Sequence, residues 1–120
     1  MNKQDAFTLA AAFAFSDKCL QNDVATGNSE YRSLNGKRSI IGHFITDELY
    51  EPDMEQYSIY GLFNYFHGIP ELFALDDVSS QEETLSFWSE LGRIDSYYDF
   101  DGWDQLFHDI ANNHNLVYQQ

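Results

Sequence analysis

Residues 31–55, YRSLNGKRSIIGHFITDELYEPDME, decide the expected fold. Asn35-Gly36 is the strongest short hairpin signal in the chain, because a type I′ turn needs positive φ at both central residues and Asn and Gly tolerate it. The stretch Arg38–Ile45 after this turn is rich in apolar, β-branched residues, which favours a strand. We therefore expect a two-stranded β-hairpin, with Gly42 marking a bulge or a close backbone approach in its second arm.

Outward from the hairpin, the remaining signals are helical. Thr46 is a candidate N-cap for one helical turn, which Pro52 prevents from running on. Apolar residues at helical spacing predict four longer helices, over residues 3–21, 59–67 and 81–94 and from Asp99 or Asp101 to about 111. A capping box, Ser80–Glu83, opens the third of them. We expect one domain over residues 1–120, of the α+β class but mostly α, with about four helices and one β-hairpin inserted after the first helix.

The same stretch resembles a family of small, uncharacterised bacterial and phage proteins. The shared pattern is an amphipathic first helix, a YR-hairpin-G-K-x-x-x-I-G motif, a D-E-x-Y-E-P-x-M-E run and a final W-x-x-x-L/F-x-x-I/F-A helix. The matching residues are Tyr31, Arg32, Gly36, Lys37, Arg38, Ile41, Gly42, Ile45, Asp47, Glu48, Tyr50, Glu51, Pro52, Met54, Glu55, Leu91, Trp103, Ile110 and Ala111. Two positions depart from the pattern: Ser39 replaces a Cys, and Asp95-Ser96 replaces a His-Asp pair. The resemblance implies a fold and a phage or bacterial setting, and it carries over no activity.

Composition limits the setting of the protein. Cys19 is the only cysteine, so no internal disulfide is possible and a reducing cytoplasm is expected, which is the host cytoplasm if a phage encodes the chain. No apolar run approaches the roughly 20 residues of a membrane span, so no membrane association is expected. No P-loop or dinucleotide-binding motif occurs, and we expect no cofactor.

The charge is strongly uneven. The net charge is −14, and residues 39–120 hold sixteen acids against one base, Arg93. Direct binding of DNA or RNA is not expected, because it needs clustered Lys and Arg to meet phosphates. A partner protein with a basic surface would be attracted instead. The alternative is that the acids serve solubility alone.

Acids and tyrosines are interleaved in two parts of this region. Carboxylates held at spacings of several ångströms can imitate a phosphate track, and Tyr is enriched at protein interfaces. We expect a partner-binding set made of Asp47, Glu48, Tyr50, Glu51, Asp53, Glu55, Tyr97, Tyr98, Asp99, Asp101 and Asp104. The hypothesis is a non-catalytic phage or mobile-element inhibitor, of the anti-CRISPR or anti-restriction type, that blocks the basic nucleic-acid-binding surface of a host defence protein. The sequence leaves the oligomeric state open.

Two other functions remain as alternatives. One is an adaptor that binds its partner through apolar contacts. The other is a small hydrolase or metal protein built on His108, which lies four residues after Asp104 on the expected last helix. Residues 95–102 resemble a calcium loop, but Tyr97 and His108 would fill two essential ligand positions, and no zinc spacing occurs. The enzyme is therefore the weakest alternative, and no catalytic or metal residue is assigned.

Overall fold

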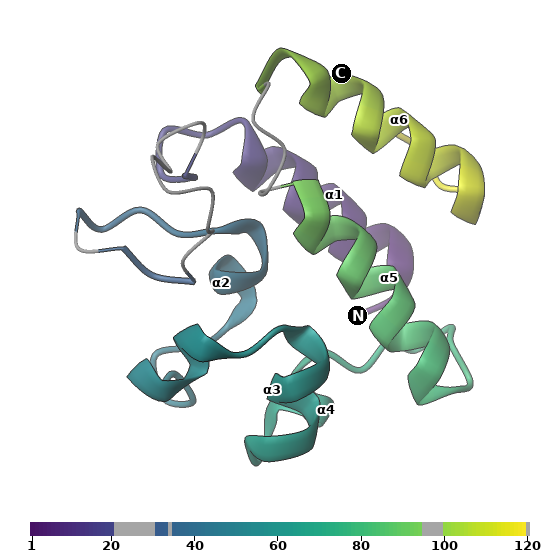
Figure 1. Cartoon of the computed structure of the whole chain (residues 1–120). Coiled ribbons are helices and arrows are strands. Elements are labelled where there is room, and N and C mark those ends of the chain that lie inside the picture. Colours follow the sequence, from purple (N-terminus) through teal and green to yellow (C-terminus); the bar gives the residue numbers. More distant parts are fainter. Residues whose placement is uncertain (21–30, 34, 95–99, 120) are drawn as a thin grey trace.

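The computed structural model describes residues 1–20, 31–33, 35–94 and 100–119, and this part of the chain is mainly helical (Figure 1). The elements in chain order are α1 (Lys3–Ala14), α2 (Ile40–Phe44), the 3-10 helix η1 (Pro52–Gln56), α3 (Ile59–Tyr65), α4 (Ile69–Leu72), α5 (Gln81–Ile94), the 3-10 helix η2 (Phe100–Gly102) and α6 (Trp103–His114). Helix α5 is central, since it packs against α2, α3 and α6. In Figure 1, η1 lies at the lower left and α6 at the upper right, with α5 between them.

The core is built from a few large aromatic side chains. The Trp88 ring makes edge-on contacts with Phe44 and Phe73, each at 4.8 Å between ring centroids. Its indole N–H donates to the Phe73 carbonyl at 2.8 Å, so burial leaves this donor paired. Between α1 and α6, the rings of Phe7 and Phe107 meet edge to face at 5.8 Å. The high aromatic content therefore fills the interior where these helices cross.

The expected β-hairpin is wrong, and so is the α+β class. The apolar residues Ile40, Ile41 and Phe44 belong to a helix that ends before Ile45, and Ser39 caps that helix by accepting a hydrogen bond from Gly42 N at 3.0 Å. The chain does reverse near Asn35-Gly36, with Gly36 at φ 85°, and Ser33 N donates to the Lys37 carbonyl at 2.9 Å. Asn35 does not share the positive φ of a type I′ turn. Among the described residues, β-pairing consists of two isolated bridges, Cys19–Arg38 and Arg32–Arg38.

Gly42 nevertheless marks a close backbone approach, as expected. A Cβ at this position would lie 2.0 Å from the carbonyl oxygen of Tyr31. Helix α2 therefore packs directly on the backbone of residue 31, and only a residue without a side chain allows it.

The N-terminal helix is shorter than expected. It begins after Asn2, which forms a capping box with Asp5, and ends at Ala14 rather than Gln21. The Ser16 hydroxyl and amide both donate to the Phe13 carbonyl, which closes the helix end. The chain then turns so that Leu20 N donates to the Arg38 carbonyl at 3.0 Å.

The other helix boundaries follow the sequence signals more closely. Gly68 has φ 88° and separates α3 from α4. Pro70 stands in the first turn of α4, where the missing N–H costs nothing, and so it does not act as a stop. The Ser80 hydroxyl accepts from Glu83 N at 3.1 Å and opens α5 as expected. No helix in the described ranges is both long and apolar enough to span a membrane.

Candidate interaction surface around the acidic run

A polar network ties residues 31 and 32 to the acidic run. The Glu55 carboxylate accepts three hydrogen bonds: from Tyr31 N at 2.8 Å, from Arg32 N at 3.1 Å and from the Tyr50 hydroxyl at 2.5 Å. The Tyr31 hydroxyl in turn donates to the Tyr57 carbonyl at 2.5 Å. Burial of the phenol, together with the nearby Glu55 charge, raises the pKa of Tyr31 to about 12. Glu55 is thus a structural acceptor for backbone groups that pair with no strand.

The guanidinium of Arg32 is the second centre of this network. It lies over the Tyr50 ring, 4.3 Å from the ring centroid, and is 2.7 Å from an Asp47 carboxylate oxygen. It also donates to the Ile45 carbonyl at 3.1 Å, and Arg38 reaches the same Asp47 oxygen at 3.4 Å. Three residues of the expected partner-binding set, Asp47, Tyr50 and Glu55, therefore have partners inside the protein.

Three other acids of that set point to solvent. Glu48, Glu51 and Asp53 are exposed, and none of their carboxylates has a hydrogen bond or ion pair with the part of the chain that the structure describes. Glu51 and Asp53 flank Pro52, which fixes the backbone at the start of η1, and buried Met54 anchors that helix to the core. Glu51 and Asp53 are thus placed at the start of η1 and Glu48 in the turn before it, and no described side chain pairs with these three carboxylates.

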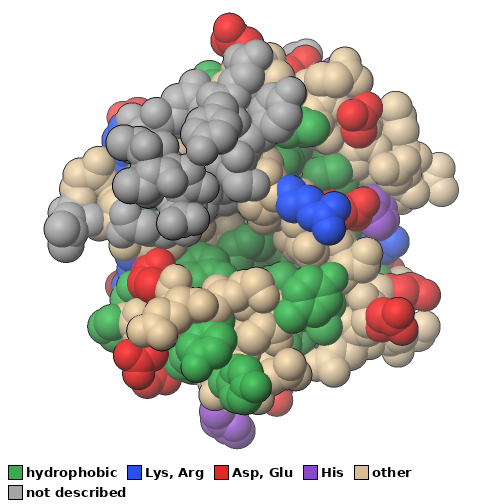
Figure 2. Space-filling view, viewed as in Figure 1, with side chains coloured by type: hydrophobic (Ala, Val, Ile, Leu, Met, Phe, Trp, Pro, Cys, Tyr) green, Lys and Arg blue, Asp and Glu red, His purple; other side chains and the backbone are tan. Residues whose placement is uncertain are grey.

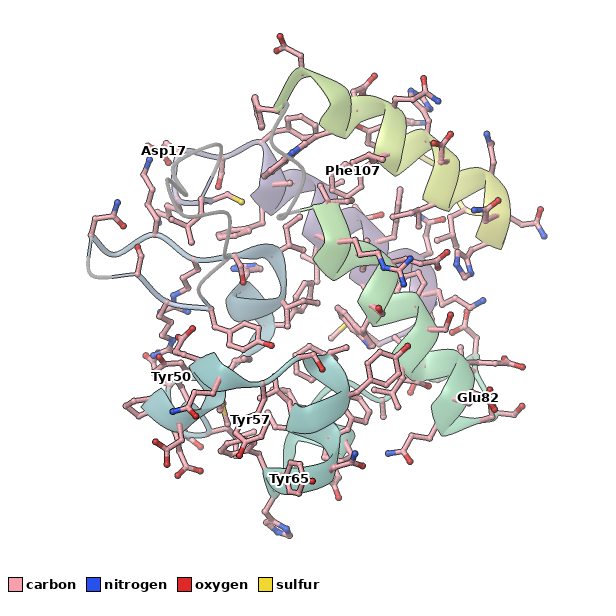
Figure 3. All side chains as sticks on the ribbon, in the orientation of Figure 1. Asp17, Tyr50, Tyr57, Tyr65, Glu82 and Phe107 are labelled. Atoms are coloured by element: carbon pink, nitrogen blue, oxygen red, sulfur yellow. The ribbon has the colours of Figure 1, made fainter. Side chains whose placement is uncertain are left out.

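Exposed tyrosine rings lie next to these acids. Tyr57, Tyr60 and Tyr65 are 37%, 48% and 71% exposed. The Tyr57 and Tyr65 rings are 5.5 Å apart, and both follow the lower edge of the molecule in Figure 3. Figure 2 shows hydrophobic side chains, tyrosines included, gathered on this side of the molecule next to acidic ones. We call the set Glu48, Glu51, Asp53, Tyr57, Tyr60 and Tyr65 the tyrosine–acid face.

The tyrosines of this face were not among the expected site residues. Two of them carry a signal in the sequence, because Tyr60 and Tyr65 fall off the buried stripe of α3, which consists of Ile59, Leu62 and Phe63, whereas Tyr57 precedes that helix. A large aromatic residue on the solvent side of a short helix is unusual enough to indicate an interface.

A hollow of about 290 Å³, the central groove, opens between α2, α3 and α5. Tyr31, Glu55, Tyr57 and Tyr60 contribute to its lining from one side, and α5 contributes Ser89, Gly92 and Arg93 from the other. The groove shares Tyr57 and Tyr60 with the tyrosine–acid face, so an exposed aromatic edge leads into a recess with a carboxylate in its wall.

The second expected acidic set does not join this face. Tyr97, Tyr98 and Asp99 lie outside the described residues. Asp101 is exposed in η2, and Asp104 in α6 accepts from the Tyr118 hydroxyl at 2.8 Å. Both elements lie across the molecule from η1 (Figure 1).

Two histidines of α6 pair with carboxylates. His108 Nε2 is 3.6 Å from the Asp104 carboxylate. That carboxylate also accepts from Tyr118, whose pKa is raised by burial and by this hydrogen bond. His114 Nε2 is 2.5 Å from Glu90 and links α6 to α5. Among the described residues, no group of three or more His, Cys, Asp or Glu side chains is placed to hold a metal ion.

Comparison with protein-family models, with curated proteins and with solved structures gave no match. Function is therefore inferred below from the placement and chemistry of these side chains.

Proposed function

We propose that this chain is a non-catalytic acidic interaction protein that binds a basic protein surface through the tyrosine–acid face. The observation that carries the proposal is the placement of Glu48, Glu51 and Asp53. They are exposed and unpaired with described neighbours, Glu51 and Asp53 flank Pro52 at the start of η1, and exposed tyrosines follow them in the chain. Uncompensated charge next to exposed aromatic rings is typical of a binding surface rather than of a purely solvating one.

The size of the electrostatic effect predicts a salt-dependent interaction. One exposed ion pair contributes only about 0.2–1 kcal/mol, so useful affinity needs several pairs acting together. The Debye length is about 8 Å at physiological ionic strength, and exposed pairs of this kind weaken as salt rises. The whole chain, at net charge −14, also speeds encounter with a basic partner.

The narrower form of the proposal names the partner class. A basic groove that normally holds nucleic acid accepts closely spaced negative charge, and Glu48, Glu51 and Asp53 place three exposed acids within residues 48–53. This acidic surface supports an inhibitor of a nucleic-acid-handling defence protein, such as a CRISPR or restriction effector, as expected from the sequence.

The test is capture of host proteins on the immobilised chain, followed by elution in rising salt and then by nucleic acid. We expect a nucleic-acid-binding protein that is released by moderate salt and displaced by its own DNA or RNA. A partner that stays bound at high salt and is not displaced by nucleic acid would contradict the proposal.

One observation favours the adaptor as a second candidate. A groove of about 440 Å³ runs between α1 and the C-terminal tail, lined by Phe7, Ala11 and Val117 among others, and Val117 is an exposed apolar residue. Binding through this groove would be insensitive to salt and weakened by Val117→Ser. The same substitution leaves binding through the tyrosine–acid face unchanged.

A further inference from the structure

Resting on the proposed function, we propose that the central groove receives an arginine side chain of the basic partner. The groove would hold the guanidinium between the exposed ring of Tyr60 and the Glu55 carboxylate. The inference adds a residue-level specificity, arginine over lysine, to a surface that charge alone would not make specific.

The protein already holds one arginine in this way. Arg32 lies over the Tyr50 ring at 4.3 Å and pairs with Asp47 at 2.7 Å, so a tyrosine face and a carboxylate enclose one guanidinium. The same two groups recur in the central groove, where Tyr57, Tyr60 and Glu55 contribute to the lining. The hollow of about 290 Å³ has room for a side chain of this size.

The Glu55 carboxylate can accept a further donor. It has about four acceptor positions, and three are used by Tyr31 N, Arg32 N and the Tyr50 hydroxyl. Its Oε1 atom accepts only the bond from Tyr31 N, which leaves one position on that oxygen. The charge is thus fixed in place by backbone donors while one acceptor position remains for a guest.

The tyrosine rings of the groove favour arginine over lysine, and its acidic residue sets where the guest binds. A guanidinium is planar, stacks on an aromatic face and donates in a fixed fork, whereas an ammonium is a compact, strongly hydrated charge. Tyr57 is held in position because its ring contacts those of Tyr65 and Phe66. Glu55 is the acidic residue among those that line the groove, so the guest guanidinium is directed toward it.

The experiment uses two defined probes, a ten-residue peptide of alternating arginine and glycine and its lysine counterpart, with the full chain isotopically labelled for NMR. We expect the arginine peptide to shift the backbone amides of residues 58–60, 89 and 92. We expect it to bind more tightly than the lysine peptide at the same ionic strength.

Three variants separate ring stacking from charge. Tyr60→Ala should weaken arginine-peptide binding about two- to five-fold, the value of one exposed cation–π contact, and Tyr60→Phe should restore it because the ring face remains. Leu9→Ala is the control, since Leu9 is a large exposed side chain that neither lines the groove nor belongs to the tyrosine–acid face. Equal affinity for both peptides with no effect of Tyr60→Ala overturns the arginine groove while leaving the charge-based function standing. Failure of both peptides to bind at low salt rejects the two together.

Discussion

Glu51 and Glu55 offer a matched pair of substitutions, because they belong to the same acidic run and the structure gives them opposite roles. Glu51→Gln removes an exposed charge that has no partner in the described residues. Glu55→Gln keeps the shape of the side chain but replaces one carboxylate oxygen by an NH₂ group. That group would face donors, either Tyr31 N on one side or Arg32 N and the Tyr50 hydroxyl on the other.

The expected effects differ in size. A hydrogen bond to a charged group contributes about 1.5–3 kcal/mol, and a donor left without an acceptor costs a further 1–3 kcal/mol when it is buried. Glu55 is half-buried, so we expect Glu55→Gln to lower the free energy of unfolding by about 2–3 kcal/mol. We expect Glu51→Gln to change it by no more than about 0.5 kcal/mol, as is usual for an exposed position.

Urea denaturation followed by tryptophan fluorescence measures both effects, because Trp88 and Trp103 are fully buried and report on the core. Equal urea midpoints for the two variants would show that Glu55 does not hold residues 31 and 32 in place.

Three further predictions concern the parts of the fold that position this surface. Gly42→Ala should lower stability by about 3 kcal/mol or more in the same denaturation assay, because its Cβ would meet the Tyr31 carbonyl oxygen at 2.0 Å; an unchanged midpoint would mean that α2 does not rest on residue 31. Ser39→Ala should cost about 1–2 kcal/mol, measured as a lower melting temperature, since the buried Gly42 amide loses its acceptor; no change would leave α2 independent of its cap. The folded-state pKa of Tyr31 is raised to about 12 from 10.0, so its stabilising contribution is complete below pH 10 and is lost as the pH rises toward 12. Tyr31→Phe should therefore reduce the fall in stability between pH 10 and 12, and a fall as large as in the unmodified protein would assign the effect to other groups.

The sequence predicted most of the longer helices because their apolar residues recur at one clear period. Helix α5 is the best example, since its capping serine and its buried residues Phe87, Trp88 and Leu91 all agree. The first helix was predicted too long, because propensity extends past Ala14 while the Ser16 contacts to Phe13 are not visible as a pattern.

The hairpin prediction was wrong because it gave the turn signal more weight than the helical spacing of the residues after the turn. Asn35-Gly36 is a strong turn signal, and a turn does form there. The residues after it follow helical spacing, however, and Ser39 is a good N-cap. The β-branched side chains of Ile40 and Ile41 favoured a strand on propensity alone, whereas burial against α1 and α5 selects the helix.

The site was only partly predictable. The sequence shows where acids and tyrosines gather, but it cannot show which acids are used internally. Asp47 and Glu55 accept from groups far away in sequence, Arg32 among them, and this follows only from the fold. The exposed Tyr60 and Tyr65 could have been selected by their position off the buried stripe of α3.

The central claim is that position, rather than total charge, makes the acids around η1 a binding surface. The direct test compares partner binding by Glu48→Gln/Glu51→Gln/Asp53→Asn with binding by Asp17→Asn/Glu82→Gln/Glu83→Gln, which removes the same number of exposed charges elsewhere (Figure 3 labels Asp17 and Glu82). Partner affinity is measured over a range of salt concentrations. The first variant should bind much more weakly than the unmodified protein, and its affinity should depend less on salt. The second variant should bind with nearly the unmodified affinity. Equal losses for the two variants would show that net charge alone drives binding, and the tyrosine–acid face would then have no special role.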